Sequence, residues 1–576
     1  MDATGETRGD RFARVAAGAV LFVPAVAFSF SFPEHFRFPK MMAGEGLVFL
    51  GALATAAAKW RWGGRPARWT DFAWDLTVAA AVVSLYMGAT HRLTGWQDIA
   101  RLAAYSSAFA LFRQLENPWK LLPLVVLAAA VNAGLALLQA GGLGLWESSR
   151  EGRHAIYGTF GNPNLLAEYL APAVVLCLAG WYGSQRRVAV GKLVVGGMLV
   201  LMIALTGSRA AVLGVCAGVL VLEFRRRFTR ARSTAILALL GVVLAGTLSL
   251  RAGGGLPGLT PNPTLSTRGL MWTVAVREWR QSPWWGAGPG SYGSGFLRSA
   301  AAAMGERKPD SVYAGVTREA HHDGLQLLAE RGLLGAGMLL LAAGLAWRGI
   351  PTYGNAIFGM AIVTAVGVES CFGFPLRVMA TGLVVAWAVA CTSHSVEQTR
   401  GPAASDLPIP ALAAAIRTLA VAVAGLLLLG RCVLAEAALG RGNETALRAG
   451  LRALPDHGEL HFRLGLGLVG AGRLPEAEAE FIAAQPGFPD PDVLFNLGWI
   501  ALQQKNDALA ADRFKEGLRL YPYFKAPAWA DYALALRGLG RRDEAIAAAQ
   551  RALEIDPGLG RARVLLGELQ SRNRGR

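Results

Sequence analysis

The amino-acid sequence predicts an all-α membrane protein: a polytopic bundle of about 12 to 13 transmembrane helices, a large extracytoplasmic loop and a C-terminal α-solenoid. Three observations lead to this prediction. Of the 576 residues, 53% are hydrophobic and only 17% are charged, whereas about a quarter of the residues in a soluble protein are charged. The apolar residues gather in charge-free blocks. The chain beyond residue 440 instead repeats with a period of about 34 residues.

The charge-free blocks have the length that a bilayer requires, because about 17 to 25 apolar residues cross its hydrocarbon core as a helix. Examples are residues 121–140, 193–208, 210–222 and 333–347. Hydropathy predicts about thirteen spans. Their approximate centres are Val23, Leu50, Ala80, Ser107, Ala129, Val174, Leu199, Gly218, Leu240, Leu340, Ile362, Val385 and Ala422.

Loop charges predict the orientation of the bundle. With the N-terminus inside, basic clusters in 59–68, 113–120, 186–192 and 225–232 all lie on the cytoplasmic side, as the positive-inside rule requires. The outside segments are then 141–164, the turn 206–209, the long segment 251–331 and everything after residue 429. Arg8, Arg11 and Arg14 precede the first apolar run, which has no evident cleavage site and is expected to be an uncleaved span.

The formal net charge of +17 does not indicate a nucleic-acid partner, because the arginines lie mainly in short loops between apolar blocks. The cysteines form no CxxC pair, so we expect packing residues and neither a metal site nor disulfides. They are Cys177, Cys216, Cys371, Cys391 and Cys432.

These features divide the chain into four predicted domains. Transmembrane helices occupy 1–250 and 333–430, the extracytoplasmic loop occupies 251–332, and the repeats occupy 440–576. The loop is too long for a simple turn. Ser266 and Thr267 are expected N-caps of an amphipathic helix within it. The apolar face of that helix is predicted from Met271, Trp272, Ala275, Val276 and Trp279.

The C-terminal repeats have the spacing of tetratricopeptide repeats. Three units and a capping helix at 560–572 are expected. The pairs that mark the units are Leu464-Gly465, Leu497-Gly498 and Tyr532-Ala533, and prolines 486, 522 and 557 close them. Such arrays bind partner proteins on a concave face, but a spacer or an assembly surface would have the same sequence.

Polar residues beside the predicted spans are the first candidates for chemistry. Asn162 in the loop 158–164 can cap the following helix, and together with Asn164 it could also form a polar rim that contacts substrate. Arg209 ends the turn between two spans, where an arginine either extends to the lipid head groups or clamps a phosphate. Arg268, near the start of the amphipathic helix, could do the same with help from the helix dipole.

The segment 320–332 enters the tenth predicted span and begins with His321, His322 and Asp323. His321, which is expected to share a helical face with Leu325 and Leu328, could act as a general base because a histidine titrates near ambient pH. An interfacial histidine without a catalytic role is the alternative. A metal is not indicated, because adjacent side chains on a helix diverge and no further ligand cluster exists.

The lesser candidates are two acidic residues, Glu330 and Glu369. Glu330 is a candidate for substrate binding or for a helix-end partner of Arg331. Glu369 needs a partner if it lies within the bilayer. No dinucleotide fingerprint, P-loop, GxSxG or HExxH motif occurs, so a nucleotide-sugar donor is not expected.

The order and membrane placement of these motifs resemble the O-antigen ligase and polymerase superfamily, which is defined by the Wzy C-terminal domain. The resemblance covers roughly residues 10–430 and is strongest in GTFGNPNLLAEYL and HHDGLQLLAERGLLG. Residues 374–376 and the appended repeats resemble the branch of the family that carries tetratricopeptide repeats.

The resemblance implies a metal-independent, inverting glycosyltransferase of the bacterial inner membrane that uses no cofactor. Its donor would be a glycan on undecaprenyl pyrophosphate, and its catalytic residues would be Arg209, Arg268 and His321. The arginines would hold the pyrophosphate, and His321 would orient or deprotonate the acceptor hydroxyl. Asn162, Asn164, His322 and Glu330 would contribute to substrate binding. His322 and Gly324 depart from the family pattern, which puts the contacts with the acceptor in doubt.

The acceptor stays open at this point. Lipid A core would indicate a ligase of lipopolysaccharide, a second lipid-linked glycan would indicate a polymerase of exopolysaccharide, and a protein hydroxyl would indicate an O-oligosaccharyltransferase. The repeats slightly favour the last two. Two other classes are a transporter or flippase of lipid-linked sugars, which would need charges at mid-membrane depth, and a scaffold for envelope assembly.

Overall fold

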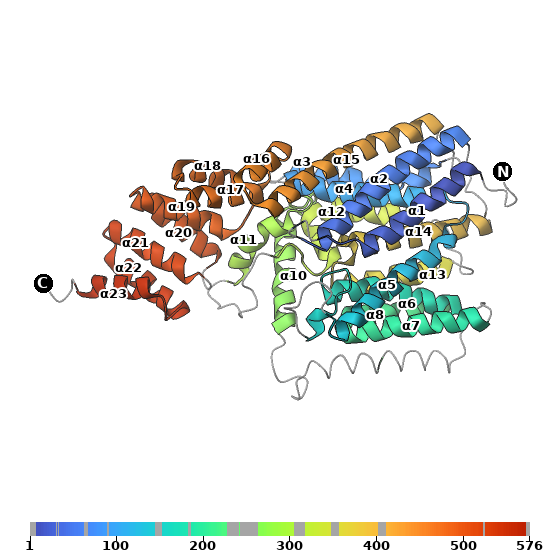
Figure 1. Ribbon diagram of the computed structural model, residues 1–576, viewed down its shortest axis with the longest axis horizontal. Helices are drawn as coiled ribbons and strands as arrows, with labels where there is room; N and C mark the ends of the chain where they lie inside the picture. The colour runs from blue at the N-terminus through green and yellow to red at the C-terminus, as the bar shows by residue number, and fades with distance from the viewer. Residues whose placement is uncertain are drawn as a thin grey trace.

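The structure is a computed structural model that describes residues 7–29, 32, 34–62, 67–88, 92–143, 152–181, 186–226, 241, 263–304, 317–346, 356–400, 410–521 and 525–571. All regular secondary-structure elements within these ranges are helices, which confirms the all-α prediction (Figure 1). The solenoid projects from one end of the bundle, next to α10 and α11, whereas α1 begins at the opposite end.

The predicted spans correspond to helices. The N-terminal ones are α1 (Arg8–Val26), α2 (Arg37–Trp62), α3 (Asp75–Gly88), α4 (Arg92–Arg113), α5 (Leu122–Ala140), α6 (Pro163–Trp181), α7 (Arg186–Thr206) and α8 (Arg209–Arg226). The C-terminal ones are α12 (Asp323–Ala346), α13 (Ala356–Glu369), α14 (Met379–Arg400) and α15 (Ala411–Arg441). The centre near Leu240 lies outside the described residues.

Helix length and composition support a multi-pass membrane protein. Among the described residues, four helices are long and apolar enough to cross a bilayer: Arg37–Trp62, Pro118–Ala140, Asp323–Leu345 and Ala411–Arg441. Others are apolar but short. Each 14-residue helix, such as α3 or α13, is about 21 Å long, whereas the hydrocarbon core is about 30 Å thick.

The packing of the bundle is typical of a membrane interior. Small side chains such as Ala17, Ala108 and Ala128 are 0% exposed, which lets neighbouring helices approach closely. Large apolar side chains point outward instead, since Leu340 and Leu427 are 73% and 66% exposed. Lipid chains would cover these leucines.

Basic residues lie at both ends of the bundle and have different partners there. At one end, the Lys59 ammonium donates a hydrogen bond to the carbonyl of Gln114 at 3.1 Å and lies 3.6 Å from the Asp10 carboxylate. The predicted cytoplasmic clusters 59–68 and 113–120 therefore share this end. At the other end, Lys40 is buried and donates to the carbonyl of Ala27 at 2.9 Å. Exposed tryptophans occur at both ends, as Trp60 and Trp284 show, a distribution typical of membrane interfaces.

The loop predicted to be extracytoplasmic contains α10 (Pro263–Gln281) and α11 (Tyr292–Met304), which pack together around Val274, Tyr292 and Phe296. The predicted N-caps were wrong: Ser266 and Thr267 lie inside α10, because the helix begins at Pro263, a residue whose fixed φ suits the first helical position. The predicted loop also includes 251–262 and 305–316, which lie outside the described residues.

Gly332 divides α12 into two parts. Its backbone is left-handed, with φ of 59°, so the helix kinks there. The segment before the kink lies beside the loop, and the segment after it holds the outward-facing Leu340. A Cβ atom at Gly332 would lie 2.5 Å from the carbonyl carbon of Trp284, so only glycine fits this approach.

The C-terminal helices form the predicted repeats. They are α16 (Glu444–Ala453), α17 (Gly458–Gly470), α18 (Leu474–Ala484), α19 (Pro491–Gln503), α20 (Asp507–Leu520), α21 (Ala526–Gly538), α22 (Arg542–Ile555) and the capping helix α23 (Gly560–Ser571). In the first two units a glycine of the leading helix packs on a ring of the following one: Gly465 on Phe481 and Gly498 on Phe514.

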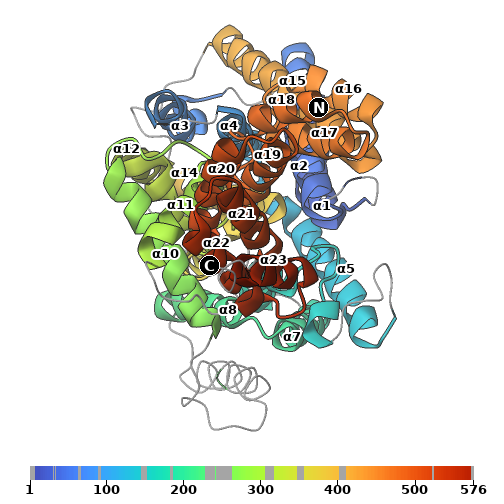
Figure 2. The same ribbon diagram turned by 90° about the vertical axis from the view of Figure 1, so that its left-hand side faces the viewer.

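The solenoid is docked onto the membrane bundle. Helix α15 continues without a break across the predicted boundary at residue 430 and ends at Gly442, so the last span and the repeats are joined directly. Phe38 of α2 shares an apolar core with Leu460 and Phe481 of the repeats, and Tyr521 packs against the core formed by α10 and α11. Viewed from this end, the solenoid lies in front of the bundle (Figure 2).

We predict that Gly332→Ala destabilises the protein by about 1–3 kcal/mol, because alanine would be strained at positive φ and would clash with the Trp284 backbone. Thermal unfolding of the detergent-solubilised protein measures this. The matched control is Gly337→Ala in the same helix, where a Cβ would meet nothing within 4 Å. Equal melting temperatures for the two variants would contradict the prediction.

Candidate functional site

Three segments that are distant in sequence meet at the end of the bundle where α10 lies. Arg209 is the first residue of α8, Arg268 lies in the second turn of α10, and His321 precedes α12. Burial lowers the pKa of Arg268, and the positive charge of Arg209 lowers it further. Burial also lowers the pKa of His321 to about 4, and the charge of Arg268 adds to this effect. The three predicted catalytic residues are thus within electrostatic reach of one another.

The turn 206–209 places Arg209 at a helix N-terminus. Gly207 has φ of 66°, and the Ser208 hydroxyl accepts a hydrogen bond from the amide of Ala211 at 3.5 Å. Ser208 is therefore the N-cap of α8, and Arg209 follows it in the first turn. Free backbone N–H groups and the helix dipole both favour an anion at such a position.

Arg209 and Arg268 are two like charges held near each other. Within the part of the chain that the structure describes, neither forms an ion pair with a carboxylate. The nearest opposing charge that acts on Arg268 is Glu168 of α6. Two partly buried guanidinium groups repel each other unless an anion lies between them, so the arrangement is suited to a ligand with several negative charges.

His321 sits in a strained turn. Its φ is 52°, which is uncommon for a residue with a side chain. Its ring meets the ring of Phe374 edge to face, with centroids 5.0 Å apart. The predicted helical face with Leu325 and Leu328 was wrong for His321, because α12 begins only at Asp323. With its pKa lowered to about 4, the imidazole is neutral at neutral pH.

The two residues after His321 start α12. His322 Nδ1 accepts a hydrogen bond from the amide of Leu325 at 3.3 Å, so His322 is the N-cap. Its ring also meets Trp272 of α10, with centroids 5.8 Å apart. Asp323 accepts hydrogen bonds from the Ser370 hydroxyl at 3.1 Å and the Leu376 amide at 3.2 Å. Both side chains thus have structural partners, and they do not converge with His321 as metal ligands would.

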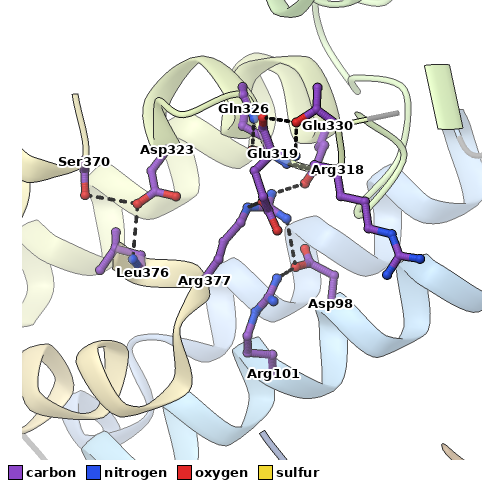
Figure 3. A network of polar contacts seen from close by, with 12 residues as sticks. Asp98, Arg101, Arg318, Glu319, Asp323, Gln326, Glu330, Ser370, Leu376 and Arg377 are labelled. Atoms are coloured by element: carbon purple, nitrogen blue, oxygen red, sulfur yellow. Dashed lines mark hydrogen bonds and ion pairs between the residues drawn. The ribbon is translucent and has the colours of Figure 1, made fainter. Parts of the chain in front are cut away.

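Figure 3 shows a network of polar contacts that centres on Arg377 and includes Glu319, which lies two residues before His321. Arg377 pairs with Glu330 at 2.5 Å and with Glu319 at 3.3 Å. Arg37 pairs with Glu319 from the other side, at 2.5 Å. Asp98 of α4 completes the network and pairs with Arg101 and Arg331.

Glu330 lies within this network and is 1% exposed. Besides Arg377, it accepts a hydrogen bond from the Gln326 amide at 2.9 Å. The expected pairing with Arg331 is not formed, since Arg331 reaches Asp98 instead. These contacts leave Glu330 facing protein groups, so its predicted role in substrate binding has no support from its position.

The loop 158–164 is held by buried polar groups. Asn162 caps α6, because its Oδ1 accepts from the amide of Asn164 at 2.8 Å. Thr159 is fixed by Asn132, at 2.7 Å between their side-chain oxygens, and by the Lys40 ammonium at 2.8 Å. Helix α6 also carries Glu168, which interacts with Arg268. Asn162 and Asn164 therefore stand at the head of a helix that lines the site.

Two buried acidic residues lie near the site, and the sequence analysis did not predict that they form a pair. Glu168 is 4% exposed and Glu369 is 0% exposed. One oxygen of Glu168 and both oxygens of Glu369 have no hydrogen-bond partner in the described structure. Their charges influence each other. An acid inside an apolar run is costly in a membrane, and this signal could have identified Glu168 within its motif.

The family models match two parts of the chain. Residues 194–340 match the O-antigen ligase model, Wzy_C, and this segment contains Arg209, Arg268, His321 and Glu330. Residues 526–559 match the tetratricopeptide repeat model, and they correspond to α21 and α22. The predicted resemblance is thus confirmed for two segments: one is similar to the O-antigen ligase family and the other to tetratricopeptide repeats. No curated protein matches it.

Several solved structures resemble the chain. YrrB, described as a TPR protein with an unusual peptide-binding site, is 20% identical over 23% of this chain and 69% of its own, with a TM-score of 0.22. MamA is 21% identical over 24% of this chain and 84% of its own, with a TM-score of 0.23. The hetero-tetramer Cut9-Hcn1 is 13% identical over 92% of this chain and 87% of its own, with a TM-score of 0.22. Scores this low support no inference about the present structure.

The loop beside the site contains an acid that is buried outside the membrane-spanning helices. Glu278 of α10 is 3% exposed and packs against Gly295 of α11. Burial raises the pKa of Glu278 to about 8, and the negative charge of Glu330 raises it further. The carboxyl group is therefore neutral at neutral pH.

We predict that Glu278 makes the stability of the protein depend on pH. The pKa of the folded state, about 8, exceeds the ordinary value of 4.5, so the folded protein binds a proton that the unfolded chain lacks between these values. Stability should fall as pH rises from 4.5 to 8, by at most about 1.4 kcal/mol per unit. Thermal unfolding across this range measures the slope. Glu278→Gln should flatten it, whereas the exposed Glu516→Gln should not, and an unchanged slope in Glu278→Gln would refute the assignment.

Proposed function

We propose that this membrane protein is a glycosyltransferase of the O-antigen ligase and polymerase type. It transfers a glycan from an undecaprenyl-pyrophosphate carrier to an acceptor hydroxyl. The observation that carries the proposal is the juxtaposition of Arg209 and Arg268 beside the neutral imidazole of His321. Neither guanidinium group forms an ion pair with a carboxylate of the described residues.

The arginines are suited to a pyrophosphate. Guanidinium groups bind phosphate oxygens through paired, charge-assisted hydrogen bonds. Arg209 also begins α8, whose amide groups and dipole favour negative charge. As the bond between the sugar and the pyrophosphate breaks, charge develops on the leaving oxygen. Fixed positive charges at that point stabilise the transition state more than the ground state.

His321 is suited to the acceptor. The neutral imidazole accepts the proton of the acceptor hydroxyl while the hydroxyl oxygen forms its bond to the anomeric carbon. The bond from that carbon to the pyrophosphate oxygen breaks on the opposite face, so the configuration inverts. The electron pair of the broken bond leaves with the pyrophosphate, and the proton on His321 returns to solvent. The proposed step uses no metal and no cofactor.

We propose that the site lies on the outer face of the inner membrane. The basic clusters 59–68 and 113–120, which are joined by the hydrogen bond from Lys59 to Gln114, lie at the end of the bundle opposite to the site. Basic residues in loops favour the cytoplasm. The extracytoplasmic loop and the solenoid would then share the outer side with the acceptor. The acceptor is a polysaccharide, a lipid A core or a protein. The docked repeats favour an acceptor or assembly factor that the repeat domain binds through protein–protein contacts.

A transporter of lipid-linked sugars is the second candidate, and one observation favours it. Glu168 and Glu369 are buried, and three of their oxygens have no hydrogen-bond partner among the described residues. Buried ionisable groups in membrane proteins also mark the pathways of transported substrates. The two functions differ in the fate of the carrier. If the protein is a transferase, an inactive variant accumulates lipid-linked glycan on the outer face of the membrane. If it is a transporter, an inactive variant retains that glycan on the inner face.

We predict that Arg209→Ala, Arg268→Ala and His321→Ala each reduce glycan transfer by about 100-fold or more, because each removes a group that acts in the transition state. Transfer is measured in membranes supplied with the lipid-linked glycan that accumulates in a deletion strain. Arg537→Ala, which breaks an ion pair with Glu568 in the repeats, is the control and should retain activity. Normal transfer by any of the three site variants would refute its proposed role.

We also predict the pH dependence of transfer. His321 must be neutral to accept a proton, and its pKa is lowered from 6.5 to about 4. The rate should therefore hold as pH falls through 6.5 and should decline only as pH approaches about 4. Initial rates between pH 3.5 and 8 test this, and a decline centred near 6.5 would contradict the neutral buried histidine.

A further inference from the structure

Arg377 lies in the connection between α13 and α14, where η5 (Pro375–Arg377) forms a short 3₁₀ turn. Its side chain is 12% exposed. The guanidinium group reaches two carboxylates at once: Nη2 lies 2.5 Å from Glu330 and Nε lies 3.3 Å from Glu319. Nη1 is also 3.9 Å from Asp98. The planar fork of an arginine is the side chain that can hold several carboxylates in fixed directions.

The two carboxylates that Arg377 holds, Glu319 and Glu330, lie before and after His321 in the sequence. Glu319 precedes it by two residues in the same segment. Glu330 follows it on α12 and is joined to that segment through Gln326, whose amide group donates to Glu330 at 2.9 Å. The Gln326 carbonyl oxygen accepts from the amide of Ala320 at 2.9 Å. The chain on both sides of His321 is therefore fixed to the same guanidinium.

The segment that carries Arg377 also contacts the imidazole itself, because the ring of Phe374 packs edge to face on His321 at 5.0 Å. The turn needs such support, since His321 has φ of 52°. A residue with a side chain is strained in this region and persists there only where its surroundings over-determine its conformation. Arg377 and its partners supply that constraint.

The same contacts set the charge near His321. Burial alone would raise the pKa of Glu319, but Arg377 and Arg37 lower it below its usual value. Glu319 is therefore ionised, and its charge raises the pKa of His321, against burial and Arg268. The ionisable groups that act on this pair are Arg268 of α10, Arg37 of α2, Arg101 of α4 and Arg377.

We propose that Arg377 is a positioning residue of the transfer centre: by holding Glu319 and Glu330 together it fixes the strained turn that presents His321 to the acceptor and balances the negative charge beside the imidazole. This inference rests on the proposed function. Arg377 touches neither donor nor acceptor in it. Its effect should therefore appear in the rate of the chemical step and in the pH profile, and not in donor binding.

The test compares full-length variants in membranes with the lipid-linked glycan that accumulates in a deletion strain. Arg377→Gln should lower the maximal rate by about tenfold or more, with the half-saturating donor concentration within about threefold of wild type. The acid limb of the pH profile is the range in which the rate declines as His321 becomes protonated. It should move upward from about 4, because Glu319 loses one of its counter-charges and its negative charge then favours protonated His321 more strongly. Arg377→Lys should restore the rate only partly, since an ammonium cannot span both carboxylates.

Removing Arg377 alone leaves a buried carboxylate without its partner, which could unfold the protein. The double variant Arg377→Gln/Glu330→Gln removes this charge and should regain thermal stability while keeping the low rate and the shifted acid limb. Arg537→Gln, which breaks the pair with Glu568 in the repeats, is the matched control and should behave as wild type.

The outcomes separate the two proposals. If Arg268→Ala abolishes transfer while Arg377→Gln keeps the wild-type rate and acid limb, the inference about Arg377 fails and the proposed function stands. If the double variant regains both stability and the full rate, Arg377 only stabilises the fold and the inference about its positioning role also fails. If Arg268→Ala and His321→Ala transfer normally, the proposed function itself fails.

Discussion

The bilayer offers no hydrogen-bonding partner to a polar group in its interior, and this constraint determines where the chain places its chemistry. Inside the bundle, small residues such as Ala108 and Ala128 are fully buried, and leucines such as Leu340 face outward. The candidate site lies instead at one end, where the helices α6, α8 and α12 begin. Helix N-termini, arginines and an imidazole can coexist there because water and head groups are within reach.

Charges at this end fall into two groups with different partners. Arg377, Glu319, Glu330 and Asp98 are buried and paired with one another, as charges in a low dielectric must be. They connect α4, α12 and η5 and hold the turn around His321. Arg209 and Arg268 lack ion-pair partners in the described chain. Two like charges without a carboxylate partner among the described residues are what the proposed anionic ligand requires.

The repeats are part of the same assembly. Helix α15 continues directly into them, and Tyr521 of the solenoid packs on the core formed by α10 and α11. Arg318, three residues before His321, lies 3.9 Å from Glu459 of α17. A partner held by the solenoid would therefore be held at a fixed place relative to the loop. Exposed ion pairs contribute little energy, so the apolar contacts maintain this arrangement.

The sequence by itself determined the all-α class and the repeats, because hydrophobic periodicity and repeat length are written along the chain. Its local motifs also predicted Arg209, Arg268 and His321 as site residues. It did not reveal the turn at His321, the position of Glu330 or the roles of Arg377 and Glu168. Those depend on contacts between segments tens to hundreds of residues apart, such as Arg37 with Glu319. Only the tertiary structure decides which buried charges find partners, since pairing depends on distance and burial and not on sequence spacing.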